Sequence, residues 1–251
     1  LPSVLGRIGL AYLFAGLIAL NTGWRGRLVW FAGLLIGYWA ALKFVPVPGF
    51  GAGDLEPGHT LTDYIDRTLI PGKLYKEVRD PEGLFATIPA IGTALAGAMT
   101  GQFLKDSQRS GYFKTAAMAV VGAICLALAH FWDRDFPINK NLWTPSYAVW
   151  SAGWASLLLA ACHALFDRRG WRPFGRSMGI NAIVAYAGSW AMACVLERSG
   201  LFAAAYRGLL QPLLAPICGD EAASLAFAIC FVGFWWVLAW GMARRGWRVV
   251  I

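Results

Sequence analysis

The chain has 251 residues, of which 58% are hydrophobic and only 14% are charged, and its formal net charge is +8. A soluble domain carries about 25% charged residues, so this composition cannot cover a water-facing surface. These values exclude a soluble globular enzyme, a disordered chain, a coiled coil and a disulfide scaffold. The sequence therefore predicts an all-α fold, a polytopic transmembrane helix bundle that forms a single integral membrane domain over residues 1–251.

Long uncharged stretches predict where the chain crosses the membrane. A spanning helix needs about 20 mostly apolar residues, and terminal Arg and Lys side chains can extend a shorter one toward the interface. About seven spans meet this condition, at 4–22, 28–46, 83–104, 113–132, 144–166, 178–197 and 222–243. The segment 199–219 carries Arg207 in its middle and two prolines, so an interfacial or re-entrant hairpin is predicted there.

The charges of the connecting segments predict the orientation. The segments 22–27, 105–114, 167–176 and 244–251 hold twelve basic residues against two acidic ones, whereas 46–82, 133–143 and 197–221 hold eight against twelve. Because Lys and Arg collect on the cytoplasmic side, the C-terminus is predicted to be cytoplasmic and the 47–82 loop to lie outside. The net charge then reports topology and contact with membrane lipid, and no nucleic-acid partner is expected.

The cysteine, histidine and glycine patterns give less information about function. The cysteines form no CxxC pair and the three histidines show no metal-ligand spacing, so no metal site is expected. Of the histidines, His130 is favoured for a role because it lies on the acid-rich side. The spacings Gly33 to Gly37 and Gly97 to Gly101 are typical of close helix packing and permit a homodimer.

The 47–82 loop holds the first polar cluster, formed by Asp66, Arg67, Asp80 and Glu82. These side chains could bind sugar hydroxyls or an amine by charge-assisted hydrogen bonds. The alternative is a structural role, with Asp80 as the N-cap of the next span, Pro81 at its first position and Glu82 in its first turn. The residues leave both interpretations open.

A second cluster, Asn139, Lys140, Asn141 and Trp143, precedes the fifth predicted span. Thr144 and Pro145 would make an ordinary helix start, but the run before them is richer in polar groups than a cap requires, which favours binding.

The third cluster is Asn181 with Arg172 and Arg176, at the start of the sixth predicted span. The arginines could simply mark the cytoplasmic side, or they could bind the phosphates of a cofactor, because the planar guanidinium pairs with phosphate through two parallel hydrogen bonds.

Five motifs in this order resemble the heparan-alpha-glucosaminide N-acetyltransferase family and its bacterial relatives. They are Tyr64-Ile-Asp-Arg67, Leu74-Tyr75, Asp80-Pro-Glu-Gly83, Asn139-Lys-Asn-Leu-Trp143 and Gly179-Ile-Asn-Ala-Ile-Val-Ala-Tyr-Ala-Gly188. The resemblance covers about residues 1–195. It implies an integral membrane acyltransferase, in a bacterial inner membrane, that takes acetyl from cytosolic acetyl-CoA and passes it to an aminosugar on the outer side.

The same resemblance implies site residues and one departure. Asp66, Arg67, Asp80, Glu82, Asn139, Lys140, Asn141 and Trp143 are expected to position the sugar, and Asn181, Arg172 and Arg176 the acetyl-CoA. The family's catalytic histidine lies in a preceding portion, and none of His59, His130 or His163 aligns with it. Together with the abrupt start at Leu1, this indicates the C-terminal part of a longer protein. Lys73 also stands where relatives often have a histidine.

Two other function classes stay open at this point. A sugar transporter or permease would suit seven spans and a polar outer loop, although no inverted repeat is visible. A non-catalytic remnant of the acyltransferase family would account for the absent histidine portion.

Overall fold

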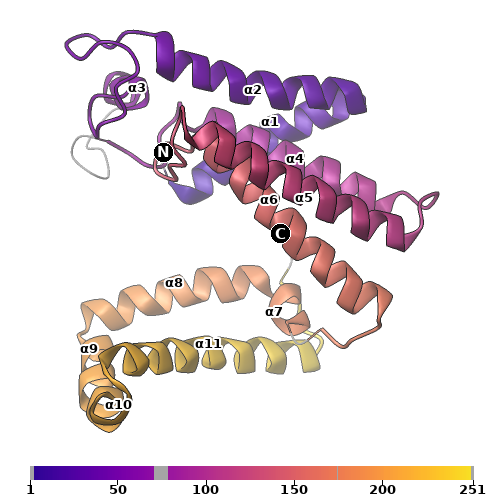
Figure 1. Cartoon of the computed structure of the whole chain (residues 1–251). Coiled ribbons are helices and arrows are strands. Elements are labelled where there is room, and N and C mark those ends of the chain that lie inside the picture. The colour runs from indigo at the N-terminus through magenta and orange to yellow at the C-terminus, as the bar shows by residue number, and fades with distance from the viewer. Residues whose placement is uncertain (1–2, 71–78, 174, 250–251) are drawn as a thin grey trace. The chain divides into compact units, whose positions relative to one another are not determined.

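The computed structural model describes residues 3–70, 79–173 and 175–249, and within them the regular structure is helical, without a strand, which confirms the all-α prediction. Figure 1 labels the elements. In chain order they are α1 (Val4–Asn21), α2 (Trp24–Phe44), α3 (Leu61–Leu69), α4 (Thr87–Lys105), α5 (Gly111–Asp133), α6 (Pro145–Cys162), the π-helix η1 (His163–Arg168), α7 (Arg176–Ile180), α8 (Ala182–Arg198), α9 (Leu201–Ala205), the π-helix η2 (Tyr206–Leu210), α10 (Gln211–Cys218) and α11 (Asp220–Arg244).

A helix stands at each of the seven predicted spans. Among the described residues, five helices are long and apolar enough to cross a membrane: α1, α2, α5, α6 with η1, and α11. The count becomes six if the bent pair within 201–218 is one span. Several helices of this kind make the chain an integral membrane protein, while seven spans and a cytoplasmic C-terminus stay predictions.

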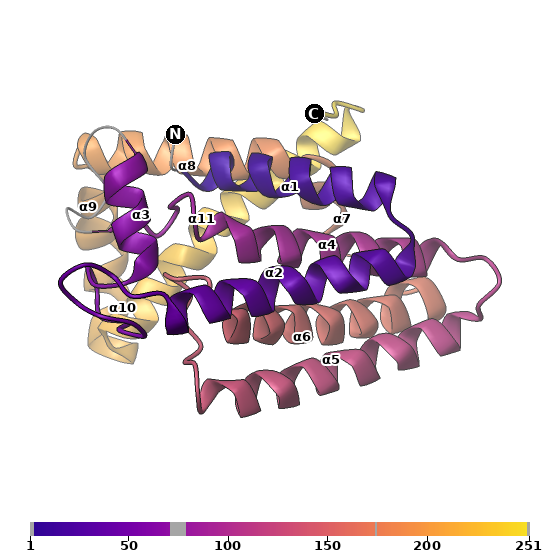
Figure 2. The same ribbon diagram turned by 90° about the horizontal axis from the view of Figure 1, so that it is seen from above.

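The described residues cluster into two compact units, 1–171 (unit 1) and 172–251 (unit 2). In unit 1, α1 packs on α4, α4 also contacts α2 and α6, and α5 lies along α6. Figure 2 shows these five helices side by side, with the short α3 beside one end of the bundle. The long helices therefore form the scaffold, and one end of it carries the loops and α3.

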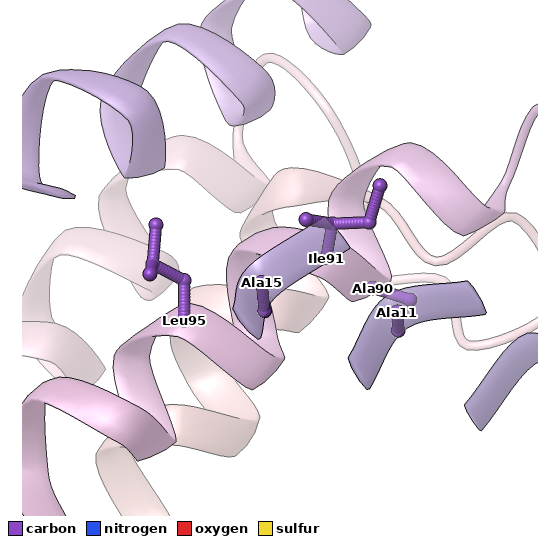
Figure 3. Packing of buried hydrophobic residues seen from close by; sticks show 5 residues of the cluster. All are labelled: Ala11, Ala15, Ala90, Ile91 and Leu95. Atoms are coloured by element: carbon purple, nitrogen blue, oxygen red, sulfur yellow. The ribbon is translucent and has the colours of Figure 1, made fainter. Parts of the chain in front are cut away.

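Small residues form the contact between α1 and α4. Ala11 and Ala15 of α1 are buried against Ala90, Ile91 and Leu95 of α4, as Figure 3 shows. Alanine side chains let two helix backbones approach closely, which increases van der Waals contact where lipid removes the hydrophobic driving force.

The helices α5 and α6 pack still more closely, at Gly122 and Gly153. A Cβ added to Gly122 would lie 2.9 Å from the Gly153 carbonyl oxygen, and one added to Gly153 would lie 3.0 Å from that of Gly122. The glycines singled out in the sequence do not do this, because Cβ atoms added at Gly33, Gly37 and Gly97 would meet nothing within 4 Å. In unit 1, then, glycine spacing alone did not identify the closest helix contact.

The outer surface of the long helices is apolar. In each of the five candidate spans only 17% of the most apolar window is buried inside the structure. Large side chains such as Leu20 (85% exposed) and Phe131 (71% exposed) point outward. A water-soluble protein rarely exposes so much continuous apolar surface, so these faces are the ones that contact lipid.

In unit 2, α8 runs beside α11, with α9 and α10 at one end of the pair and α7 at the other (Figure 1). The close contact is again made by a glycine, because a Cβ on Gly188 would overlap the Trp235 indole. The predicted hairpin at 199–219 consists of α9, η2 and α10, and its two halves are bent by 49°. A bend of this size occurs in a broken span and in a re-entrant loop, so the interfacial placement stays a prediction.

Candidate functional site

The 47–82 segment contains a helix, α3, where the sequence predicted only a loop. The Thr60 hydroxyl caps it by accepting the Asp63 N–H at 3.1 Å. Asp63 accepts the Gly58 N–H at 2.8 Å, and Arg67 donates to the Gly58 carbonyl at 2.7 Å. The side chains of Asp63 and Arg67 thus hold the preceding loop against α3. Arg67 was predicted to bind substrate.

Asp66, on the same helix, is completely buried. Its Oδ1 accepts the Leu84 N–H at 2.9 Å, while Oδ2 has no hydrogen-bond partner in the described part of the chain. Burial raises the pKa of Asp66 to about 6, assisted by the charges of Asp80 and Asp63 and opposed by the backbone N–H donors. The carboxyl group therefore ties α3 to the segment before α4.

A pH effect on stability follows from this pKa. Since the folded state binds the Asp66 proton more tightly than the unfolded state, protonation contributes stability, which is complete below the ordinary pKa of 3.8 and is lost as the pH rises through about 6. We expect the wild type to lose up to about 3 kcal/mol between pH 4 and 7 relative to Asp66→Asn. Thermal unfolding of both proteins in the same buffers measures this; parallel pH profiles would contradict it.

The Asp80-Pro-Glu-Gly83 motif forms a turn rather than the start of a helix. The Asp80 carboxylate accepts the Glu82 N–H at 2.9 Å, and its carbonyl accepts the Gly83 N–H at 3.0 Å. Helix α4 begins only at Thr87 and has Ala86 as its N-cap, so the alternative in which Asp80 caps the next span is wrong. Asp80 is buried and Glu82 is half-buried.

Gly83 is required in this turn by its contact with Asp66. An added Cβ would lie 2.5 Å from Asp66 Cγ and closer still to Oδ2. The backbone of the turn therefore rests directly on the buried carboxyl group, an approach that only glycine permits.

The second predicted cluster forms a tight loop before α6. The Asn139 side chain accepts the N–H groups of Asn141 at 2.9 Å and Leu142 at 3.3 Å, which leaves Lys140 and Asn141 exposed at the tip. Thr144 is the N-cap of α6 and Pro145 follows it, so the predicted helix start is confirmed. Asn139 thus shapes the loop, and its neighbours present their side chains outward.

Trp143 has an unusual backbone conformation, with φ at +50°. A bulky residue rarely adopts a positive φ, and such strain costs about 1–3 kcal/mol and concentrates at functional sites. Its indole N–H donates to Thr93 of α4 at 3.2 Å, and its ring packs on Tyr147 at 5.4 Å. The half-buried Trp143 is therefore held inside unit 1 by α4 and α6.

Tyr38 of α2 connects α3 to this loop. Its buried hydroxyl donates to the Leu142 carbonyl at 2.6 Å and lies 3.1 Å from the Thr62 hydroxyl. Its ring also packs on Phe85 at 5.3 Å. A single side chain therefore contacts α3, the loop before α6 and the segment before α4.

Arg7 of α1 makes the second connection. The guanidinium group donates to the Pro81 carbonyl and lies over the Trp143 ring at 5.0 Å. It interacts electrostatically with the carboxylates of Glu82, Asp66 and Asp80. Arg7 is only 7% exposed, and its Nε is buried without a partner among the residues described. Its charge is thus directed at the acidic turn.

These contacts bring the first and second predicted clusters together at one end of unit 1. Residues 58–67, 80–85 and 139–144, distant in sequence, meet around Arg7 and Tyr38. Sequence reasoning did not identify Arg7, Tyr38, Thr62 or Gly83 as part of the site. A signal for Arg7 existed, because an ionisable side chain inside a predicted span is costly and normally has a function.

The third predicted cluster lies in unit 2, where Asn181 separates α7 from α8. The buried side chain accepts the Val249 N–H at 3.3 Å through Oδ1, whereas Nδ2 is buried with no acceptor in the described structure. Arg172 and Arg176 are exposed. The cluster thus combines two exposed cations with one buried donor that lacks a partner.

The histidines make contacts of their own, and one predicted motif is not described by the structure. His59 pairs with Asp54 at 2.8 Å and stacks on Phe50, and His163 contacts the Thr115 hydroxyl at 2.7 Å. His130 is exposed on α5. The motif Leu74-Tyr75 and Lys73 lie outside the described residues. In the part of the chain that is described, no three His, Cys, Asp or Glu side chains gather as metal ligands would.

Fold and site together define an all-helical, polytopic membrane protein with a buried charged cluster at one end of unit 1. No family model matches the chain. It is 31% identical over 189 residues to the heparan-alpha-glucosaminide N-acetyltransferase of Homo sapiens, a match that covers 62% of this chain and 28% of that protein. The mouse protein of the same name is 32% identical over 184 residues, which is 60% of this chain and 28% of the relative.

The comparisons support the relationship to this acetyltransferase family that the motifs indicated. The matched stretch spans less than a third of either curated relative, at 28% of each. Together with the apolar helices, the similarity supports a membrane protein of an acyltransferase family.

Proposed function

We propose that this chain acts in the transfer of acetyl from acetyl-CoA, on the cytosolic side of a bacterial inner membrane, to an aminosugar on the outer side. The observation that carries the proposal is the convergence in unit 1 of segments that resemble the acetyltransferase family. Residues 64–67, 80–83 and 139–143 are separated in sequence but are joined through Arg7 and Tyr38. Independent loops would not need buried polar side chains to hold them together.

The proposed acceptor site divides its residues by exposure. Lys140 and Asn141 are exposed and Glu82 is half-buried, so these side chains can reach a sugar directly. Asp66, Asp80, Arg67 and Asn139 use their side chains on the backbone of the site's own loops and are positioning residues. Trp143 supplies an aromatic face at a strained backbone position, and aromatic rings pack well against the apolar faces of sugars.

The proposed donor site is the Asn181 cluster. When bound, acetyl-CoA supplies an activated acetyl group, and its phosphates are anionic. The exposed guanidinium groups of Arg172 and Arg176 suit phosphate, and the buried Asn181 Nδ2 is a donor that still lacks an acceptor. The two exposed guanidinium groups and the unpartnered Nδ2 of Asn181 fit a phosphorylated donor, while Oδ1 of Asn181 accepts the Val249 N–H.

Acetyl transfer to an amine needs a neutral amine, a general base, stabilisation of the tetrahedral oxyanion and two reactants held together. We assign binding and positioning roles to the residues above. No residue of this chain is assigned the proton-transfer role, because none of His59, His130 and His163 aligns with the histidine that the family resemblance implies.

Asn141→Ala tests the acceptor site. We expect it to lower kcat/KM for glucosamine by about tenfold, because it removes a polar contact of about 1.4 kcal/mol. The loop should remain intact, since Asn139 holds it through backbone N–H groups. The measurement is formation of labelled N-acetylglucosamine by membranes that contain the protein, supplied with labelled acetyl-CoA.

The matched control is Asn21→Ala. Asn21 is exposed at the end of α1 and donates to the Leu17 carbonyl of its own helix. We expect this variant to transfer acetyl at the wild-type rate. Full activity in both variants would remove Asn141 from the acceptor site. Absence of any transfer by the wild-type protein, expressed from its complete gene, would contradict the proposed reaction.

A further inference from the structure

The carboxyl end of α11 is closed by a folded-back tail. The Gly246 N–H donates to the Ala243 carbonyl at 3.2 Å and the Trp247 N–H to the Met242 carbonyl at 2.9 Å, with Gly246 at φ +73°. This pair of bonds is the Schellman arrangement, which satisfies the last helix carbonyls and turns the chain back on the helix. The Val249 N–H then donates to Asn181 at 3.3 Å, so the tail is fixed at two points.

A cavity of about 480 Å³ lies between this tail and the last turns of α11. Val237, Leu238 and Met242 form an apolar wall, and Trp240 and Trp247 line it as well. Because the tail is tied back, Trp247 becomes a side of the cavity instead of projecting from the chain end.

Two guanidinium groups line the same cavity. Arg244 lies over the Trp240 ring at 4.7 Å and Arg245 over the Trp247 ring at 5.6 Å. Stacking on an aromatic face holds a guanidinium in place while its N–H donors stay free to bind. The arginines are therefore arranged in advance rather than spread into solvent.

The charge of the cavity is positive. A helix carboxyl end carries about half a negative charge, which the two arginines outweigh. None of the described residues that line the cavity is acidic. A phosphate group would thus find two cationic partners and no carboxylate to repel it.

The position of the cavity identifies the kind of molecule. Helix α11 has the length and hydropathy of a membrane span, so its end lies at the membrane surface, where lipid headgroups are. Phosphate-binding arginines beside an apolar wall match an amphiphile with an anionic head and a hydrocarbon chain. We propose that this cavity binds one anionic phospholipid, with its phosphate on Arg244 and Arg245 and an acyl chain along Val237 and Leu238.

This proposal does not depend on the acetyltransferase reaction, and it is tested without it. The purified protein in detergent is mixed with dioleoyl-phosphatidylglycerol or dioleoyl-phosphatidylcholine, and retained lipid is counted by native mass spectrometry. We expect about fivefold more bound phosphatidylglycerol than phosphatidylcholine on the wild type. The double variant Arg244→Gln/Arg245→Gln should lower phosphatidylglycerol to the phosphatidylcholine level.

The matched control, Arg134→Gln/Arg198→Gln, removes two exposed arginines outside the cavity and should keep the preference. The variant Arg244→Lys/Arg245→Lys keeps both charges but loses the paired guanidinium donors, so it should retain only part of the preference for phosphatidylglycerol. This variant tests the proposal even if the glutamine variant does not fold. A glutamine variant that still prefers phosphatidylglycerol, or a control that loses the preference equally, would overturn the proposal. Displacement of the lipid by an equal concentration of coenzyme A would overturn it too, because the phosphate site would then belong to the donor.

Discussion

Arg7→Met is expected to lower the free energy of unfolding by about 3–5 kcal/mol, the cost of removing one partner from a buried charged cluster. Methionine replaces the apolar stem of the arginine but not its charge or its N–H donors. The carboxylates of Asp66, Asp80 and Glu82 would lose their shared cation, the Pro81 carbonyl its donor and Trp143 its stacked group.

Arg25→Met is the matched control, because Arg25 is exposed in the first turn of α2. Its change in unfolding free energy should stay within about 0.5 kcal/mol. Thermal or denaturant unfolding of the two purified variants at one pH gives the comparison. Equal stability of the two would show that Arg7 does not hold the acidic turn and the Trp143 loop together.

Gly83→Ala is expected to destabilise the protein by about 3 kcal/mol, at the upper end of the cost of overpacking. The new methyl group would overlap the Asp66 carboxyl group, so either the turn or α3 must move. Since Oδ1 of Asp66 also accepts the Leu84 N–H, a shifted turn would break that hydrogen bond as well.

A double-mutant cycle isolates this contact. In the Asp66→Ala background, Gly83→Ala should cost at least about 1.5 kcal/mol less, since residues in direct contact show coupling of 0.5–3 kcal/mol. Gly97→Ala in α4 is the control for adding a methyl group to a glycine without a steric clash, because a Cβ there meets nothing within 4 Å. Additive effects of Asp66→Ala and Gly83→Ala would contradict the close approach.

The helices could be predicted from the sequence because charged residues mark their ends. Predicted ranges such as 113–132 and 222–243 differ from α5 and α11 by only about two residues at either end. The predicted start of the third span, at residue 83, was too early, because α4 begins at Thr87. Asp80, Pro81 and Glu82 have the composition of a helix start but form a turn. The turn is held by Asp66 of α3, which accepts the Leu84 N–H and lies against Gly83. Such a contact between distant segments is not visible in the local sequence.

The sequence predicted which segments hold the polar residues of the candidate site, but not that these segments meet in space. Charged and amide side chains indicated where binding residues lie, and the structure joins those segments. The joining residues, Arg7 and Tyr38, stand inside apolar helices, and their partners are 74 and 104 positions away along the chain. Periodicity and spacing describe neighbours within one helix, and contacts of this range carry no such pattern. In the same way, the break at Asn181 was hidden inside one continuous apolar stretch.

The glycine contact between α5 and α6 limits how unit 1 can move. With Gly122 and Gly153 meeting backbone to backbone, neither helix can rotate about its axis without driving a side chain into its partner. Sliding by a single residue would replace one glycine by a larger neighbour. Any conformational cycle of this unit must therefore carry α5 and α6, together with the loop 134–144 that joins them, as one rigid body. Its hinges must lie in the flanking segments, 106–110 and 169–171.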